Sequence, residues 1–159
     1  MGFTVSQSDT SLFVKTDGED IIVLLLYVDD IILTGSNVTK VQGVITALSE
    51  IFDLKDMGML TYFLGMHIQY KGNGDMFLSQ TKYAQELIKR AGIENCRPAP
   101  TPSKPHTQLL LSAGQPLSDP SLYRSIVGAL QYLTFTRPDI AYSVNVVCQY
   151  MTTPTDAHM

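Results

Sequence analysis

The chain has 159 residues, is 45% hydrophobic and 16% charged, and carries a formal net charge of -4 at pH 7. This composition is too apolar for a disordered chain and too weakly charged for a coiled coil, so we expect a buried core in one compact domain or two small ones. The negative charge alone argues against nucleic-acid binding, which depends on Lys and Arg neutralising phosphates. However, residues 1–30 hold six acids against one base, whereas residues 82–104 hold five bases against two acids. The sequence is therefore still compatible with a local basic surface.

The two cysteines, Cys96 and Cys148, lie far apart and have no metal-ligand spacing. They are interpreted as free thiols in a reducing compartment, and Cys148 as a core residue. The N-terminal residues lack the apolar segment of a signal peptide. The apolar run over residues 21–28 is too short to span a membrane. We therefore expect neither a signal peptide nor a membrane partner.

Three strand-like runs open the chain, at residues 11–15, 21–28 and 31–34. Their β-branched residues, and the turn-forming residues between them, favour an antiparallel meander. The continuous apolar run over residues 21–28 suggests a strand that is buried on both faces. Asp29 and Asp30 would then form the tip of the hairpin between the second and third strands.

A helix is predicted over residues 38–52, because apolar residues recur there every three or four positions and Ser36 or Asn37 offers an N-cap. We expect one apolar face of this helix to pack on the sheet, through Val41, Ile45, Leu48 and Phe52. The first part of the chain is therefore predicted to be an antiparallel sheet with a flanking helix.

A second hairpin is predicted from Leu60–Tyr70 and Met76–Leu78, because the residues between them are rich in glycine and asparagine, which supply a positive φ at turns. A helix over about residues 80–91 should follow, with Ser79 as its cap and Gly92 as its stop. The pattern thus predicts a β-hairpin followed directly by a helix.

Residues 97–105 contain four prolines, so this stretch suits neither a helix nor a central strand. It is interpreted as a semi-rigid linker over residues 97–118 and as the boundary between two subdomains. Beyond it, Asp119-Pro120 and Pro138-Asp139 each start a predicted helix. The first should bury Leu122, Ile126, Leu130 and Leu133, and the second Ile140, Val144, Val147 and Met151, ending before Pro154. We expect these helices to form a separate helical pair.

Tyr27-Val28-Asp29-Asp30 places two neighbouring carboxylates between apolar strands, with no lysine or arginine beside them in the sequence. Burying an unpaired carboxylate is costly, and adjacent carboxylates repel each other. The conflict is relieved if both lie at an open hairpin tip and bind a divalent cation such as Mg²⁺, which takes carboxylates together with substrate phosphates. Such ions stabilise the attacking and leaving oxygens of phosphoryl transfer. The alternative is an ordinary turn with solvated aspartates, and the tetrapeptide alone does not decide between them.

The segments around this motif decide between the two interpretations. The motif is followed by an apolar strand, Thr-Gly, and then Phe-Asp-Leu-Lys-Asp-Met-Gly-Met-Leu-Thr-Tyr-Phe-Leu-Gly at residues 52–65. Further blocks lie at residues 78–83, 123–133 and 136–141. In this order and spacing, and over essentially the whole chain, they resemble the polymerase domain of copia-type reverse transcriptases from LTR retrotransposons.

The resemblance implies RNA-directed DNA synthesis, with an RNA template, a DNA primer and deoxynucleoside triphosphates as partners, in a cytoplasmic or particle-associated location. It implies that Asp29 and Asp30 are the catalytic, metal-binding carboxylates, with Mg²⁺ or Mn²⁺ as the cofactor. Tyr27 and Val28 would face the primer end and the incoming nucleotide, and Lys55 would lie near the leaving pyrophosphate. The primer grip, a hairpin that holds the 3′ end of the primer, would consist of Phe63, Leu64, Gly65 and Met66.

Each of these roles has a simpler alternative. Phe63, Leu64 and Met66 also suit a plain apolar core, and Lys55 suits a solvated surface. His67 is expected to be a surface or hydrogen-bonded histidine, because no second ligand has a matching spacing.

The implied fold is α+β: an antiparallel palm-type sheet with flanking helices, followed by a small helical thumb or connection part. We expect a partial palm over residues 1–96, the linker over residues 97–118, and the helical part over residues 119–159, ahead of a ribonuclease H domain. The family's first catalytic block, which brings another metal-binding aspartate, has no counterpart in the sequence. We therefore expect weak metal binding, and no polymerisation by this chain without the missing upstream half of the polymerase.

Three functions compete at this point. The first is part of a retrotransposon reverse transcriptase, and the second is a non-catalytic remnant that binds RNA or protein. The third is an unrelated Mg²⁺-dependent phosphotransfer enzyme using Asp29 and Asp30, which leaves the later blocks unexplained. Arg137 suits a contact with the template backbone or an ion pair with Asp139. The resemblance favours the first function.

Overall fold

The chain divides into two compact units, residues 1–60 and residues 61–159. The computed structural model describes residues 1–103, 109–110 and 112–159. Part of the predicted proline-rich linker, residues 104–108 and 111, therefore lies outside the described residues. Antiparallel sheets and α-helices are present in the chain, so the predicted α+β class is confirmed.

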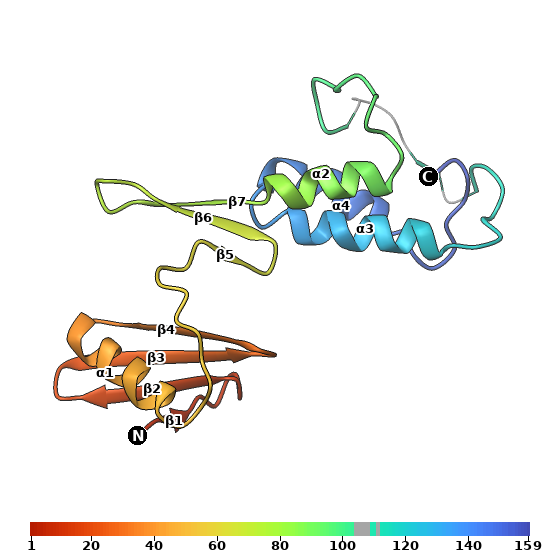
Figure 1. Cartoon of the computed structure of the whole chain (residues 1–159). Helices are drawn as coiled ribbons and strands as arrows, with labels where there is room; N and C mark the ends of the chain where they lie inside the picture. Colours follow the sequence, from red (N-terminus) through yellow and green to blue (C-terminus); the bar gives the residue numbers. More distant parts are fainter. Residues whose placement is uncertain (104–108, 111) are drawn as a thin grey trace. The chain divides into compact units, whose positions relative to one another are not determined.

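The first unit is a four-stranded antiparallel sheet with one flanking helix (Figure 1). Each strand pairs with the next one along the chain. The elements are β1 (Thr4–Val5), β2 (Leu12–Asp17), β3 (Asp20–Tyr27), β4 (Asp30–Gly35) and α1 (Val38–Ser49). The predicted antiparallel meander is confirmed, with small shifts at the strand ends.

The core of this unit lies between the sheet and α1. Ile22 and Leu24 alternate along β3 on one face of the sheet and are buried, as is Val44 of α1. Gly35 at the end of β4 permits the helix to approach closely, because a Cβ there would lie only 3.0 Å from a methyl carbon of Val41. The predicted packing of α1 on the sheet is thus confirmed.

Two predictions for this unit were wrong. Phe52 does not belong to the packed face of the helix: α1 ends at Ser49, so Phe52 lies beyond the last turn and is exposed. β3 is not buried on both faces. Ile21 and Tyr27 on its second face are largely exposed, because within the described residues of this unit α1 covers the opposite face.

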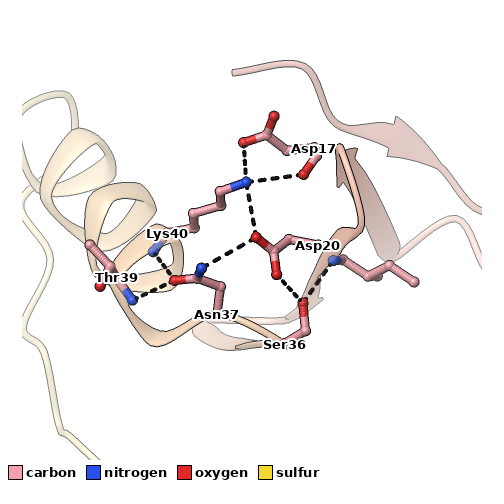
Figure 2. A network of polar contacts seen from close by, with 7 residues as sticks. Asp17, Asp20, Ser36, Asn37, Thr39 and Lys40 are labelled. Carbon is pink, nitrogen blue, oxygen red and sulfur yellow. Dashed lines mark hydrogen bonds and ion pairs between the residues drawn. The ribbon is translucent and has the colours of Figure 1, made fainter.

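A polar network fixes the start of α1 to the β2–β3 turn, as Figure 2 shows. Asn37 is the N-cap, and its side-chain oxygen accepts from the backbone N–H groups of Thr39 and Lys40 at 3.0 and 3.3 Å. The Lys40 ammonium lies 2.8 Å from a carboxylate oxygen of Asp17 and 3.0 Å from one of Asp20. Its hydrogen bonds hold the pKa of each carboxyl below the ordinary value. This network lies at the opposite end of β3 from the turn that contains Asp29.

The second unit combines a three-stranded antiparallel sheet with helices. The elements are β5 (Tyr62–Phe63), β6 (Met66–Tyr70), β7 (Met76–Ser79), α2 (Thr81–Arg90), α3 (Ser121–Leu133), the 3₁₀ helix η1 (Pro138–Ile140) and α4 (Ala141–Cys148). The predicted strand over residues 60–70 is two strands, because a turn at Leu64-Gly65 interrupts it. The predicted hairpin between β6 and β7, and the helix after it, are confirmed.

The cap predicted for α2 was wrong. Gln80, and not Ser79, is the N-cap residue, and its side chain makes no capping hydrogen bond. Gln80 is buried, and its carboxamide oxygen instead accepts from the Thr136 hydroxyl at 2.8 Å. Gly92 follows the helix with a φ of 68°, which confirms its predicted role as the stop.

α2 and α3 share one core, although the proline-rich stretch separates them in sequence. Leu87 of α2 packs with Ala129 and Leu133 of α3, and all three are buried. The compact units therefore divide near residue 60, and not at residues 97–118 as the sequence suggested. The helices before and after the proline-rich stretch therefore belong to one packed unit.

The predicted apolar face of α3 is only partly correct. Leu122 is exposed, and its neighbour Tyr123 is buried, donating its hydroxyl hydrogen to the carbonyl of Val147 at 2.7 Å. The predicted last helix is shorter than expected, because it ends at Cys148 and leaves Met151 outside it. Leu133 is buried as predicted, whereas Tyr123, Val127 and Ala129 are buried although the sequence pattern did not select them.

The described end of the predicted linker is tied to the last residues of the chain. Leu117 N–H donates to the carbonyl of Pro154 at 2.9 Å, and Asp156 N–H donates to that of Gln115 at 3.0 Å. The imidazole of His158 is buried and stacks on the ring of Tyr150 with centroids 4.0 Å apart. This part of the stretch predicted as an extended linker is therefore fixed by tertiary contacts.

Candidate functional site

Asp29 and Asp30 lie at the tip of the β3–β4 hairpin, as the sequence predicted. Tyr27, the last residue of β3, pairs with Asp30, the first residue of β4, so that Val28 and Asp29 form a two-residue turn. Val28 has a φ of 53°, and Asp29 has no positive φ. A positive φ at the first turn position alone is the pattern of a type II′ turn, in which glycine is normally found at that position.

The backbone at Val28 is strained. A β-branched residue in the left-handed region is an outlier, and the conformation costs roughly 1–3 kcal/mol. The side chain does not compensate through packing, since it is 82% exposed. Strained residues of this kind are found at functional sites, where the surrounding structure holds them in place. The conformation of Val28 therefore marks this turn independently of its two aspartates.

The two carboxylates are exposed and available to a ligand. Among the described residues, neither Asp29 nor Asp30 takes part in a side-chain hydrogen bond or an ion pair. Two unpaired, adjacent carboxylates repel each other, and a hard divalent cation that binds oxygen relieves the repulsion. The donor set thus fits part of a Mg²⁺ or Mn²⁺ site. No group of three or more His, Cys, Asp or Glu side chains suited to a metal ion occurs in the part of the chain that the structure describes.

The residues predicted as the primer grip form a tight hairpin in the second unit. Phe63 of β5 pairs with Met66 of β6, and Leu64 and Gly65 form the turn between them. Their φ values are 50° and 81°, and two consecutive positive φ angles define a type I′ turn. Glycine suits the second position, whereas leucine at the first is strained. Like Val28, Leu64 is a bulky residue held in a backbone conformation that it disfavours.

Two tyrosines that sequence reasoning did not assign to the site lie against this turn. The hydroxyl of Tyr132 in α3 donates a hydrogen bond to the carbonyl of Leu64, and Tyr83 in α2 contacts the ring of Tyr132 edge-on. Both residues belong to family blocks noted above, but the position of a tyrosine within a helix does not indicate which distant turn it contacts.

A cavity of about 390 Å³ opens beside the same turn. Residues of the sheet and of the first turns of α2 form its wall. The lining residues are Tyr62, Gly65, His67, Ser79, Thr81, Lys82 and Gln85. His67 is exposed, as expected for a surface histidine. The Leu64-Gly65 turn thus borders an open groove whose lining includes one lysine, Lys82.

Two further charged residues, Lys55 and Arg137, were considered for contacts with the substrate or the template. Lys55 is exposed in the segment after α1 and makes no ion pair within the described residues. Arg137 pairs with Asp139 through two short contacts of 2.8 and 2.7 Å, the second of the two arrangements open to it from the sequence. The bidentate pair raises the pKa of Arg137 and lowers that of Asp139.

Comparison with known proteins shows the family of the chain. Residues 1–105 match the family described as reverse transcriptase (RNA-dependent DNA polymerase), and the chain belongs to that family. It is 45% identical over all 159 residues to the retrovirus-related Pol polyprotein from transposon RE1 of Arabidopsis thaliana. The identity is also 45%, over 158 residues, for the Pol polyprotein from transposon RE2 of the same plant. The predicted resemblance to copia-type elements is thereby confirmed.

The chain corresponds to a small part of these relatives. It spans 11% of the length of each of the two polyproteins. An uncharacterized mitochondrial protein of Arabidopsis thaliana is 52% identical over 132 residues, which are 83% of this chain and 54% of that protein. No solved structure matches the chain. Within the described residues, no helix has the length and apolar character needed to cross a membrane.

Proposed function

We propose that this chain supplies the two-aspartate metal-binding turn and the primer-holding hairpin of an RNA-directed DNA polymerase encoded by a copia-type retrotransposon. The observation that carries the proposal is the β3–β4 turn. Its two carboxylates are exposed and unpaired among the described residues, and it lies in a chain that belongs to the reverse transcriptase family. The strained φ of Val28 supports a functional role for the same turn.

Asp29 and Asp30 would hold Mg²⁺ or Mn²⁺ together with the phosphates of an incoming deoxynucleoside triphosphate. The metal would neutralise charge that develops on the attacking and leaving oxygens. Two adjacent carboxylates are a poor cage for the ion by themselves, so a third carboxylate would come from another segment of the polymerase. The isolated chain should therefore bind the metal weakly and should not polymerise.

The neighbouring residues would take the positions that the family implies. Tyr27 and Val28 would contact the primer end and the nucleotide, and Lys55 the leaving pyrophosphate. The hairpin of residues 63–66 would hold the primer strand on its RNA template, with the adjacent groove as the path of the strand. The exposed lysine of that groove, Lys82, is suited to bind a backbone phosphate of the strand.

The test is primer extension on an RNA template, with this chain alone and with the upstream half of a copia-type polymerase added as a second polypeptide. Synthesis is expected only from the mixture. Asp29→Asn should lower it by about 100-fold or more, because the substitution keeps the size of the side chain but removes the charge that holds the cation. Asp53→Asn, an exposed aspartate in the same unit, is the matched control and should leave synthesis unchanged.

Titration of the isolated chain with Mn²⁺ provides a second measurement. The paramagnetic ion should broaden the amide NMR signals of residues 28–30 before others, and this effect should be lost in Asp29→Asn. Robust synthesis by the chain alone would show that the active site is assembled differently. Synthesis by the mixture that survives Asp29→Asn would show that another residue carries the metal. RNA binding without synthesis by any mixture would favour a non-catalytic RNA-binding module.

A further inference from the structure

We propose that Tyr132 is a positioning residue for the Leu64-Gly65 turn. Through it, helix α3, which follows the proline-rich stretch, is coupled to the primer-holding hairpin that precedes this stretch. This inference rests on the proposed function of the hairpin as the primer grip. The carrying observation is a hydrogen bond from the Tyr132 hydroxyl to the carbonyl oxygen of Leu64, which joins residues 68 positions apart in the sequence.

The turn lies on a platform of aromatic rings. The ring of Tyr132 contacts that of Tyr83 edge-on, with centroids 5.2 Å apart and an interplanar angle of 80°. It contacts Phe135 in the same manner at 5.7 Å and 65°. A Cβ on Gly65 would lie 3.5 Å from the Tyr83 ring and 3.8 Å from the Tyr132 ring, which is ordinary contact distance. The backbone of the turn therefore rests against both tyrosines.

The turn needs support from outside the hairpin. β5 has only two residues and pairs with β6 at two positions, so strand pairing alone holds the turn weakly. Leu64 is, in addition, held at a φ of 50°, which a non-glycine residue disfavours. A hydrogen bond to the Leu64 carbonyl fixes the orientation of the peptide group between Leu64 and Gly65. Tyr132 thus stabilises the conformation that the turn needs in order to present its backbone.

The helix that carries Tyr132 is itself well anchored. Leu133, the next residue, is buried against Leu87 of α2, and Ala129 one turn earlier lies in the same cluster. The hydroxyl is therefore presented from a rigid element and not from a loop. The position of the primer-holding turn consequently depends on a helix that follows the proline-rich stretch, although the turn itself precedes it.

The first test uses the whole chain and hydrogen exchange at residues 62–68. Tyr132→Phe keeps the ring and removes the hydroxyl, so exchange in this segment should rise roughly two- to twelve-fold, the factor that corresponds to one net hydrogen bond. Tyr83→Phe is the matched control, because the Tyr83 hydroxyl makes no hydrogen bond among the described residues. It should leave exchange unchanged. Equal exchange in Tyr132→Phe and the unaltered chain, with both folded, would overturn the proposal.

The second test separates positioning from general stability in the reconstituted polymerase. Tyr132→Phe should raise the KM for primer–template several-fold, while the KM for the nucleotide and the exchange of the α3 amides stay unchanged. A purely structural role would instead accelerate exchange throughout α3. If the proposed function is wrong, Asp29→Asn should leave synthesis intact. If Asp29→Asn abolishes synthesis and Tyr132→Phe alters neither KM nor local exchange, the proposed function stands and this inference fails.

Discussion

Replacing Val28 with glycine should stabilise the first unit, contrary to the usual effect of glycine in a hairpin. The left-handed conformation costs an ordinary residue roughly 1–2 kcal/mol, and more for a β-branched one, and glycine removes that cost. Against this gain stand about 0.4–1 kcal/mol of extra entropy in the unfolded chain. The lost burial is small, because Val28 is 82% exposed. The expected net change is a gain of about 0.5–1 kcal/mol in the free energy of unfolding.

Val38→Gly is a closely matched control. Val38 is 83% exposed, so the two valines are equal in residue type and exposure, but Val38 lies in the first turn of α1 and has no positive φ. Its replacement should destabilise by about 0.4–1 kcal/mol, through unfolded-state entropy and helix propensity. The difference between the two variants cancels the shared costs. It should therefore reflect mainly the strain at Val28, at about 1–2 kcal/mol.

The assay is urea unfolding of the whole chain, followed through amide exchange of the buried β3 residues Ile22 and Leu24. A residue-specific probe is needed because the chain forms two compact units, and a chain of several units does not in general unfold in a single two-state transition. In the reconstituted polymerase, Val28→Gly should also lower synthesis in spite of its greater stability, since the turn would lose its fixed conformation. If Val28→Gly destabilises β3 as much as Val38→Gly does, the argument from strain is refuted.

The remaining predictions concern the Lys40 network and the shared helical core. Asp17 and Asp20 have pKa values lowered mainly by hydrogen bonds from Lys40. Their contribution to stability is complete above the unfolded carboxyl pKa of about 3.9 and is lost as the pH falls through the lower folded values. Lys40→Met should therefore flatten the fall of the unfolding free energy below about pH 4 in acid titrations, and an unchanged slope would contradict this. Leu87→Ala should destabilise the second unit by about 2–5 kcal/mol, whereas the exposed Ile88→Ala should cost much less. Because α2 and α3 share a core, exchange should accelerate at Ala129 as well as in α2, and an effect confined to α2 would count against the shared core.

The sequence alone determined the features that depend on neighbouring residues. The two-aspartate hairpin tip follows from two apolar runs joined by turn-forming residues, and Asn37 caps α1 because a cap acts on amides two and three positions away. The family resemblance rested on ordered blocks of residues and needed no structure. The metal-binding role of Asp29 and Asp30 remains a prediction from the same motif.

Tertiary structure decided what depends on distant contacts. The positive φ of Val28 could not be predicted from the residue type, because valine disfavours this conformation and the paired strands impose it. Leu87 packs on Leu133, although the proline-rich stretch separates them in sequence. The proline content therefore predicted a subdomain boundary between two helices that share one core. Tyr132 reaches the carbonyl of Leu64 because α2 orients α3 against the hairpin. Local interactions are encoded within a few residues, whereas such contacts exist only after the elements pack.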